Sequence, residues 1–472
     1  MKSPEKKTNP TDSKDPSTGK MIMFSMGYFF NGFLIVAFGS FVWHYYEIEL
    51  GLKAVVSLWP LYLWIVNVIY TVFSMVINPI IGFLSDKPRK WTKKWGFHTP
   101  WIIIGGIPTA LLFFLIFIPP HNTGIESVFP ILLYFLITVF LYDVFNSLFQ
   151  THSFGAFPAH FRGDATRRKA GMITQIFIFV ANFLGTTIWS LTILPGNPAT
   201  FTFAAFLSLI LLGSSLAVFI PGSKETKEIK DRFIIGYETA EKKSFLWTMK
   251  MAIKQKNFML ALLTYILFMV ALGLTSMNTV NFIDDVLKKE QNIRMFGSLF
   301  MLITSVATMP IWIRVARKIG HSNTYALGMV CFGFSLLSYS FVSNLIGYYI
   351  VNSLNGLSVA MYTVVLSPVL ADCYDEFAVK TKKHLESTLI GIRNLFLRVS
   401  IMIQTFIVAI VHLITAYDSN NPSREALFGL RLIQGVIPFF FCVIAAIVFF
   451  VWFDLKGKKK EEIMQQLKDM GL

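Results

Sequence analysis

Twelve long apolar stretches constrain the fold of this 472-residue chain more than any other feature of its sequence. A helix needs about 20 residues to cross the hydrocarbon core of a bilayer, and in lipid every backbone amide must find its partner within the same segment. The sequence therefore predicts an all-α polytopic membrane protein with twelve transmembrane helices. The expected spans are residues 21–46, 56–84, 100–119, 128–158, 170–194, 200–220, 258–283, 293–317, 323–343, 346–373, 386–416 and 426–454.

Composition and charge distribution agree with a membrane protein. Hydrophobic residues make up 54% of the chain and charged residues 15%, so a water-soluble globule could not bury the apolar surface. Lys and Arg gather in both tails and in alternate loops, and the opposite loops contain only Lys53, Lys288, Lys289 and Arg424. By the positive-inside rule, we expect a cell-membrane protein with both termini cytoplasmic. The same asymmetry explains the net charge of +15, so we expect no nucleic-acid partner.

The longest polar interruption separates six expected spans from the other six. The predicted parts are a cytoplasmic tail (1–20), an N-terminal six-helix half (21–220), a cytoplasmic linker (221–257), a C-terminal six-helix half (258–454) and a second cytoplasmic tail (455–472). Two such halves joined by a basic linker are the layout of parallel-repeat transporters. The sequence contains no Gly-x-Ser-x-Gly elbow, Walker loop or zincin motif, so we expect neither an enzyme nor a bound cofactor.

Aromatic residues cluster at the ends of the expected spans. They are Trp43, Tyr45, Tyr46, Trp59, Trp95, Trp101 and Trp452. Trp and Tyr are enriched where a membrane meets water, because the ring is apolar and its N–H or O–H is polar. We therefore expect these seven side chains to form part of an interfacial belt.

The end of the second span carries a family signature. Residues 78–86 read Asn-Pro-Ile-Ile-Gly-Phe-Leu-Ser-Asp and are followed by Trp95-Gly96 and Pro100-Trp101. This run resembles the glycoside-pentoside-hexuronide:cation symporter family of the major facilitator superfamily, whose signature is Asp-Pro-x-x-Gly-x-x-Ser-Asp, a basic Trp-Gly loop and a Pro-Trp pair entering helix 3. Tyr45-Tyr46 and Pro158 extend the likeness. The resemblance implies a major facilitator fold and the transport of a carbohydrate.

The resemblance also implies a substrate site. Gln150 stands where the family has an acid on helix 4, and Phe154 stands where it has the aromatic residue that stacks on sugar. Arg398 replaces a Lys of helix 11, and Asn31 precedes Gly32, the position of the acid that anchors the sugar. We therefore expect Asn31, Gln150, Phe154 and Arg398 to bind the substrate.

The cation site of the family is altered in this chain. Its two helix 2 carboxylates correspond here to Ser74 and Asn78. Together with Ser147 these positions supply only neutral oxygens, whereas hard cations such as Na⁺ prefer anionic ones. We therefore expect no sodium coupling at that site. Asp86 and Arg89, in the loop that follows, form either a latch that gates the cytoplasmic helix ends or a solvated basic loop.

Asp143 is the one acid that the expected topology places deep within a span. Asn146, Ser147 and Gln150 follow at i+3, i+4 and i+7, so the four side chains share one helical face. Acids inside membranes are costly and usually functional, and burial favours the protonated carboxyl. We expect Asp143 to be a proton-linked coupling residue, and the alternative is a purely structural hydrogen bond between helices.

Arg398 is expected near the middle of the eleventh span. Its guanidinium stays charged and offers a planar fork to carboxylate, phosphate or sulfate. The side chain could therefore bind an anionic substrate or pair with Asp143 across the two halves, and a static ion pair between helices is the alternative.

We therefore expect a secondary active transporter that moves a small polar organic solute by alternating access, in a lipid bilayer. The solute is a sugar or sugar derivative, including anionic ones, and transport is proton-coupled or uncoupled rather than sodium-coupled. Two alternatives remain: a carrier of lysolipids or other amphiphiles, because the cavity is poor in acids and rich in Phe, and a non-transporting sensor or scaffold that keeps the transporter fold.

Overall fold

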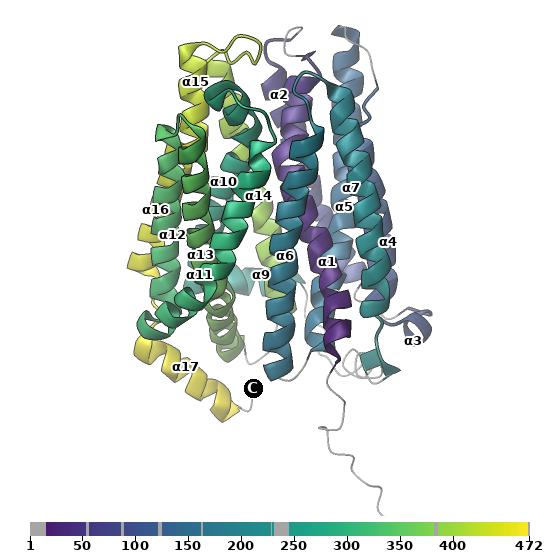
Figure 1. Cartoon of the computed structure of the whole chain (residues 1–472). Helices are drawn as coiled ribbons and strands as arrows, with labels where there is room; N and C mark the ends of the chain where they lie inside the picture. Colours follow the sequence, from purple (N-terminus) through teal and green to yellow (C-terminus); the bar gives the residue numbers. More distant parts are fainter. Residues whose placement is uncertain are drawn as a thin grey trace, which may run out of the picture.

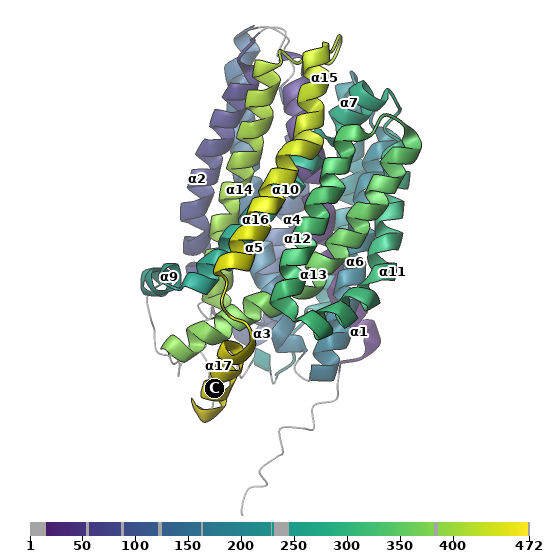
Figure 2. The same cartoon turned by 90° about the vertical axis from the view of Figure 1, so that its left-hand side faces the viewer.

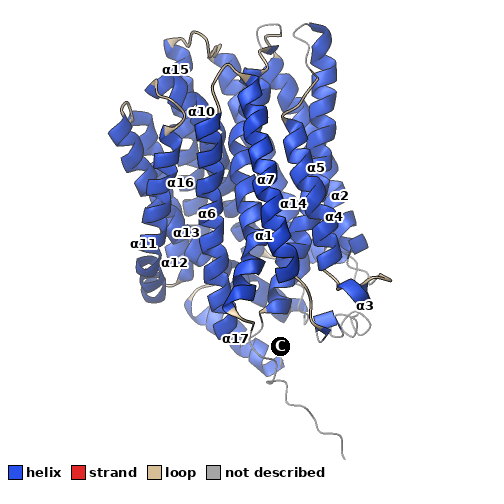
Figure 3. Cartoon of the chain, turned by 45° about the vertical axis from the view of Figure 1, so that its right-hand side comes forward, coloured by secondary structure: helices blue, strands red, loops and turns tan. Residues whose placement is uncertain are grey.

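The computed structural model describes residues 16–52, 56–85, 89–120, 125–161, 164–227, 229–230, 245–381 and 386–470. This part of the chain is a bundle of long helices and contains no strand (Figure 3). Twelve helices in it are long and apolar enough to cross a membrane. The all-α polytopic fold expected from the sequence is confirmed.

The N-terminal half contains the first six spans. They are α1 (Thr18–Ala37), continued by the π-helical turns η1 (Phe38–Val42) and η2 (Tyr45–Glu49), then α2 (Trp59–Ser85), α4 (Thr99–Ile116), α5 (Val128–His160), α6 (Asp164–Thr192) and α7 (Pro198–Gly222). The short helices α3 (Thr92–Trp95) and η4 (Ile125–Ser127) lie in loops. The first span runs to Glu49, three residues beyond its expected end. This extension carries Glu47 and Glu49 into the helix.

The C-terminal half contains the other six spans. They are α10 (Lys256–Asn281) with η5 (Phe282–Leu287), α11 (Ile293–Ile319), α12 (His321–Leu337) with η6 (Ser338–Phe341), α13 (Leu345–Thr381), α14 (Glu386–Ile414), and α15 (Arg424–Arg431) with η7 (Leu432–Val436) and α16 (Ile437–Trp452). Helices α9 (Phe245–Ile253) and α17 (Gly457–Met470) lie outside the spans. The start of α1 and all of α17 lie at the same end of the bundle, here called the terminal end (Figure 1).

Among the described residues, three helix pairs make the most extensive contacts between the two halves. Helix α2 packs on α14, α6 packs on α11, and η1 packs on α10. Helices α2 and α14 run side by side along one edge of the bundle (Figure 2). A polar side chain on any of these helices can therefore reach a partner that is hundreds of residues away in the chain.

The aromatic residues around the first loop are not an interfacial belt. The side chains of Trp43, Tyr45, Tyr46 and Trp59 are all buried within the protein. The hydroxyl of Tyr46 donates to the carbonyl of Ile116 at 2.7 Å, and the indole N–H of Trp59 donates to the carbonyl of Tyr46 at 2.6 Å. Because their polar atoms bond to backbone carbonyls inside the bundle, these rings need no contact with water.

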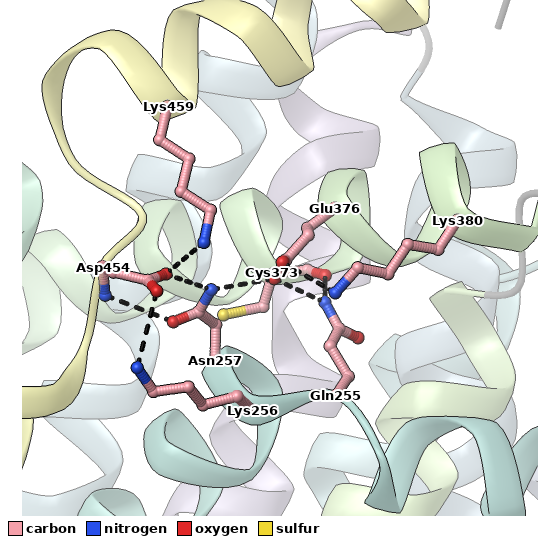
Figure 4. A network of polar contacts seen from close by, with 8 residues as sticks. All are labelled: Gln255, Lys256, Asn257, Cys373, Glu376, Lys380, Asp454 and Lys459. Carbon is pink, nitrogen blue, oxygen red and sulfur yellow. Dashed lines mark hydrogen bonds and ion pairs between the residues drawn. The ribbon is translucent and has the colours of Figure 1, made fainter.

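A hydrogen-bond network holds the C-terminal half together at the terminal end (Figure 4). The Glu376 carboxylate accepts hydrogen bonds from Gln255 at 2.9 Å and from Asn257 at 3.0 Å. Asn257 also donates to Asp454 at 2.7 Å, and Lys459 of α17 donates to Asp454 at 2.6 Å. Burial raises the pKa of Asp454, but the hydrogen bonds from Lys459 and Asn257 outweigh it and hold that pKa below its usual value. The network therefore joins α10, α13 and α17.

A comparable contact ties the segment after α7 to the start of α4 and explains the Trp-Gly motif. The Glu225 carboxylate accepts hydrogen bonds from the backbone N–H groups of Phe97 at 2.5 Å and His98 at 2.8 Å. Burial raises the pKa of Glu225, and these two N–H groups oppose the shift. Gly96 turns the chain at φ +97°, and a Cβ there would collide with the Glu225 carboxylate. Only glycine satisfies both requirements.

We predict that Gly96→Ala destabilises the protein by about 1–3 kcal/mol, because alanine is strained at this φ and displaces Glu225. Gly171→Ala is the matched control: Gly171 lies in α6 with no other atom near its absent Cβ, so helix propensity should leave it neutral or slightly stabilised. Thermal unfolding of the purified variants in detergent measures both effects. Equal midpoints for the two variants would contradict the role given to Gly96.

Candidate functional site

An ion pair joins the two halves near the middle of the bundle. Asp143 lies on the 33-residue helix α5 and Arg398 on the 29-residue helix α14. The guanidinium Nη1 of Arg398 is paired with the Asp143 carboxylate, and its Nη2 donates to the Ser147 hydroxyl at 3.0 Å. The side chain of Asp143 is 3% exposed and that of Arg398 is 19% exposed. A buried pair of this kind is expensive to break, since each charge left alone would lie in a medium of low polarity.

The local sequence of α5 explains this geometry. Asp143 and Ser147 are four residues apart, so their side chains lie one above the other on the same face of the helix. The forked guanidinium can therefore contact both at once. Tyr70 of α2 is buried beside the pair and interacts electrostatically with both charges. The structure thus brings Asp143, Ser147 and Arg398 together.

The other expected substrate-binding residues lie on the terminal side of this pair. Asn31, on α1, is buried and donates to the carbonyl of Gly27 at 3.0 Å. Gln150 is half-buried on α5, about two turns beyond Asp143. Phe154 packs against Tyr28 of α1, with ring centroids 5.1 Å apart. Of these three residues, Phe154 contacts the other helix, so it lies between α1 and α5.

The expected coupling and gating positions are described only in part. Ser74 is fully buried on α2. Asn78 lies in α2, but its side chain is outside the described part of the chain, and Asp86 is outside it altogether. The side chain of Arg89 is exposed at the terminal end, and its backbone N–H donates to the Thr92 hydroxyl at 2.8 Å. The roles assigned to these positions stay predictions.

Several buried oxygens in the N-terminal half have no hydrogen-bond partner among the described residues. They come from four helices, α1, α2, α5 and α6, and belong to Asn31, Ser74, Asn146 and Asn182. A buried polar atom without a partner costs free energy. A solute rich in hydroxyl groups could supply the missing partners. In the same described part, no group of three or more His, Cys, Asp or Glu side chains could hold a metal ion.

A second polar cluster between the halves was missed by the sequence analysis. At the end of the bundle opposite the termini, Glu47 of η2 contacts His412 of α14 at 2.5 Å. His44 contacts Asn281 of α10 at 2.6 Å. The expected first span stops at residue 46, which places Glu47 in a loop. The available signal was one His near the end of each of two expected spans, His44 and His412, and two acids just beyond the first span.

The sequence matches a family of transporters over most of its length. The family described as MFS/sugar transport protein matches residues 23–457. The chain is 22% identical over 424 residues to a lactose permease of Leuconostoc lactis, and the aligned region covers 85% of this chain and 63% of that relative. It is 21% identical over 422 residues to a lactose permease of Lactobacillus helveticus, covering 85% and 64%. The chain thus spans somewhat less than two thirds of the length of these relatives.

Solved transporter structures share the fold. A D-xylose-proton symporter superposes with a TM-score of 0.62 at 10% identity, covering 92% of this chain and 98% of that one. The nucleoside transporter NupG superposes with a TM-score of 0.59 at 13% identity, covering 93% and 99%. At these identities the likeness concerns the fold alone. The major facilitator fold is confirmed, and with the family match over residues 23–457 this chain belongs to the MFS/sugar transport protein family.

Proposed function

We propose that this protein is a secondary active transporter that moves a sugar or sugar derivative by alternating access. The observation that carries the proposal is the buried pair of Asp143 and Arg398, because it joins the two halves at mid-bundle. A solute bound between the halves would have to exchange contacts with these charges. Membership of a sugar-transport family and the lactose permease relatives favour a carbohydrate over an amphiphile.

Contacts between the halves show which end of the bundle is closed. Described polar contacts between the halves lie at the Asp143–Arg398 pair or between it and the end opposite the termini. They are Ser40 to Ser276 at 2.8 Å, His44 to Asn281 at 2.6 Å, Glu47 to His412 at 2.5 Å and Trp64 to the carbonyl of Met402 at 3.2 Å. These contacts close the end of the bundle opposite the termini in this conformation.

The pair itself suggests how a solute is recognised. Arg398 can bind sugar hydroxyls or an anionic group of the solute with the same planar fork that now holds Asp143 and Ser147. A solute that takes the guanidinium leaves Asp143 without its counter-charge, which favours a proton on that carboxyl. Solute occupancy and protonation would then be linked, which is what coupling to a proton gradient requires.

We predict that uptake is not stimulated by sodium. Ser74 supplies a neutral hydroxyl at one of the two positions of the family's cation site, and Asn78 supplies an amide at the other, whereas Na⁺ prefers carboxylates. Uptake of radiolabelled lactose into proteoliposomes is measured with Na⁺ or with choline outside, at constant pH and osmolarity. Equal rates are expected, and a saturable dependence on Na⁺ is the opposing result.

We predict that Asp143→Asn abolishes accumulation driven by a proton gradient but spares exchange, because exchange needs the halves to reorient without net proton movement. Ser147→Ala is the matched control, since it removes one hydrogen bond of Arg398 and keeps the ion pair; it should retain accumulation. Thermal unfolding of both variants checks that they are folded. Normal accumulation by folded Asp143→Asn would make the carboxylate structural and place the coupling site elsewhere.

A further inference from the structure

Charged and titratable side chains converge on the seam between the halves at the end opposite the termini. This group, here called the outer cluster, comes from the residue before η2, from η2, η5, α11 and α14, and from the loop after α14. Its members are His44, Glu47, Glu49, Asp284, Asp285, Arg294, His412 and Tyr417. The transport mechanism proposed above uses none of them.

Two histidine–carboxylate pairs are the centre of the outer cluster. His412 Nδ1 contacts the Glu47 carboxylate at 2.5 Å across the seam, with side chains 1% and 0% exposed. The second carboxylate oxygen of Glu47 accepts a hydrogen bond from the indole N–H of Trp43. His44 Nε2 contacts the Glu49 carboxylate at 2.8 Å. Both pairs are enclosed by protein.

The surroundings of His44 call for a proton on each of its ring nitrogens. Nδ1 faces the amide oxygen of Asn281 at 2.6 Å, and Nε2 faces the carboxylate of Glu49. Both of these oxygens accept hydrogen bonds, and only the protonated imidazole donates from both nitrogens. Asn281 belongs to the other half, so this arrangement exists only while the seam is closed.

The remaining members leave the outer cluster with excess negative charge. Asp284 accepts a hydrogen bond from Gln291 at 2.7 Å, and Asp285 accepts one from Tyr417 at 2.5 Å. The pKa of Tyr417 is raised well above its ordinary value, first by burial and then by the charge of the nearby Asp285. Its hydroxyl therefore keeps its proton and donates the hydrogen bond. Arg294 lies over the Phe41 ring at 4.5 Å. Among the described residues of the outer cluster, it is the only Lys or Arg.

The charge balance then requires protons. Four carboxylates, on Glu47, Glu49, Asp284 and Asp285, face one guanidinium, and the nearby Asp418 is exposed to solvent. Uncompensated charge is strongly disfavoured inside a protein. His44 and His412 are the side chains placed to offset it, because each ring contacts a carboxylate and a protonated imidazole carries the positive charge that these acids lack.

We propose that His44 and His412, with Glu49 and Glu47, form a proton-binding site that is assembled when the end of the bundle opposite the termini closes. Closure takes up protons and opening releases them to that side of the membrane. A state that binds more protons is favoured as pH falls, so acid on that side favours the closed state and alkali favours the open one. The inference rests on the proposed alternation of the two halves, but not on the identity of the solute.

The test measures opening without any sugar. Spin labels are attached at Ala199→Cys and Lys289→Cys, which are exposed and lie on different halves at this end. The full chain carries serine in place of its native cysteines. The distance between the labels is measured in nanodiscs between pH 5 and 8.5 and reports the opening. The ratio of open to closed populations should rise with pH, by up to about tenfold per pH unit for each proton released. His44→Gln and His412→Gln should each lower this slope, and the double variant should abolish it.

A matched control separates titration from loss of contact. Ser40→Ala removes the hydrogen bond to Ser276 across the same seam without removing a titratable group. It should raise the open population by the same factor at every pH. A label pair within one half, at Lys289 and Asn420, should keep its distance and so shows that each variant is folded.

Two results would overturn the proposal: a parent protein whose open population does not depend on pH, or a double histidine variant that keeps the slope of the parent. Failure of the transport function is distinguishable from both. A protein that opens with rising pH but moves no sugar retains the proton site and refutes the sugar transporter. A protein that accumulates sugar while the distance between its labels does not depend on pH retains the transport function and refutes the proton site.

Discussion

The pair of Asp143 and Arg398 is the contact on which the arrangement of the halves depends. It lies near the middle of two long helices, one from each half, where neither charge can be replaced by water without opening the bundle. Separating the two charges in such a medium would cost several kcal/mol. The pair therefore favours the arrangement in which the two halves meet at mid-bundle.

The two ends of the bundle are held together differently. At the end opposite the termini, Glu47 with His412 and His44 with Asn281 connect one half to the other. At the terminal end, the network around Glu376 lies within the C-terminal half, and the contact of Glu225 ties the segment after α7 to the start of α4. These contacts hold each half together internally at the terminal end, which suits two bodies that move as units.

Part of the site could be predicted because its signal is local. Asp143 is conspicuous as an acid within an apolar span, and the spacing to Ser147 follows from the period of the helix. Arg398 is conspicuous for the same reason. The sequence allows Arg398 either to bind an anionic substrate or to pair with Asp143, because the period of a helix gives the face of a residue but not the neighbour of that face. The roles of Asn31, Gln150 and Phe154 came from resemblance and stay predictions.

The sequence by itself determined that the protein lies in lipid, with twelve spans in two halves. The reason is that a helix in lipid satisfies its backbone hydrogen bonds within about 20 consecutive residues. Only the tertiary structure decided which polar groups meet. Glu47 and His412 are 365 positions apart, and neither lies in a pattern that points to the other. The helix of Glu47 continues past its expected end through the wide turns of η1 and η2, which set the direction of each side chain. Packing of η1 on α10 and of α2 on α14 then brings the two halves together.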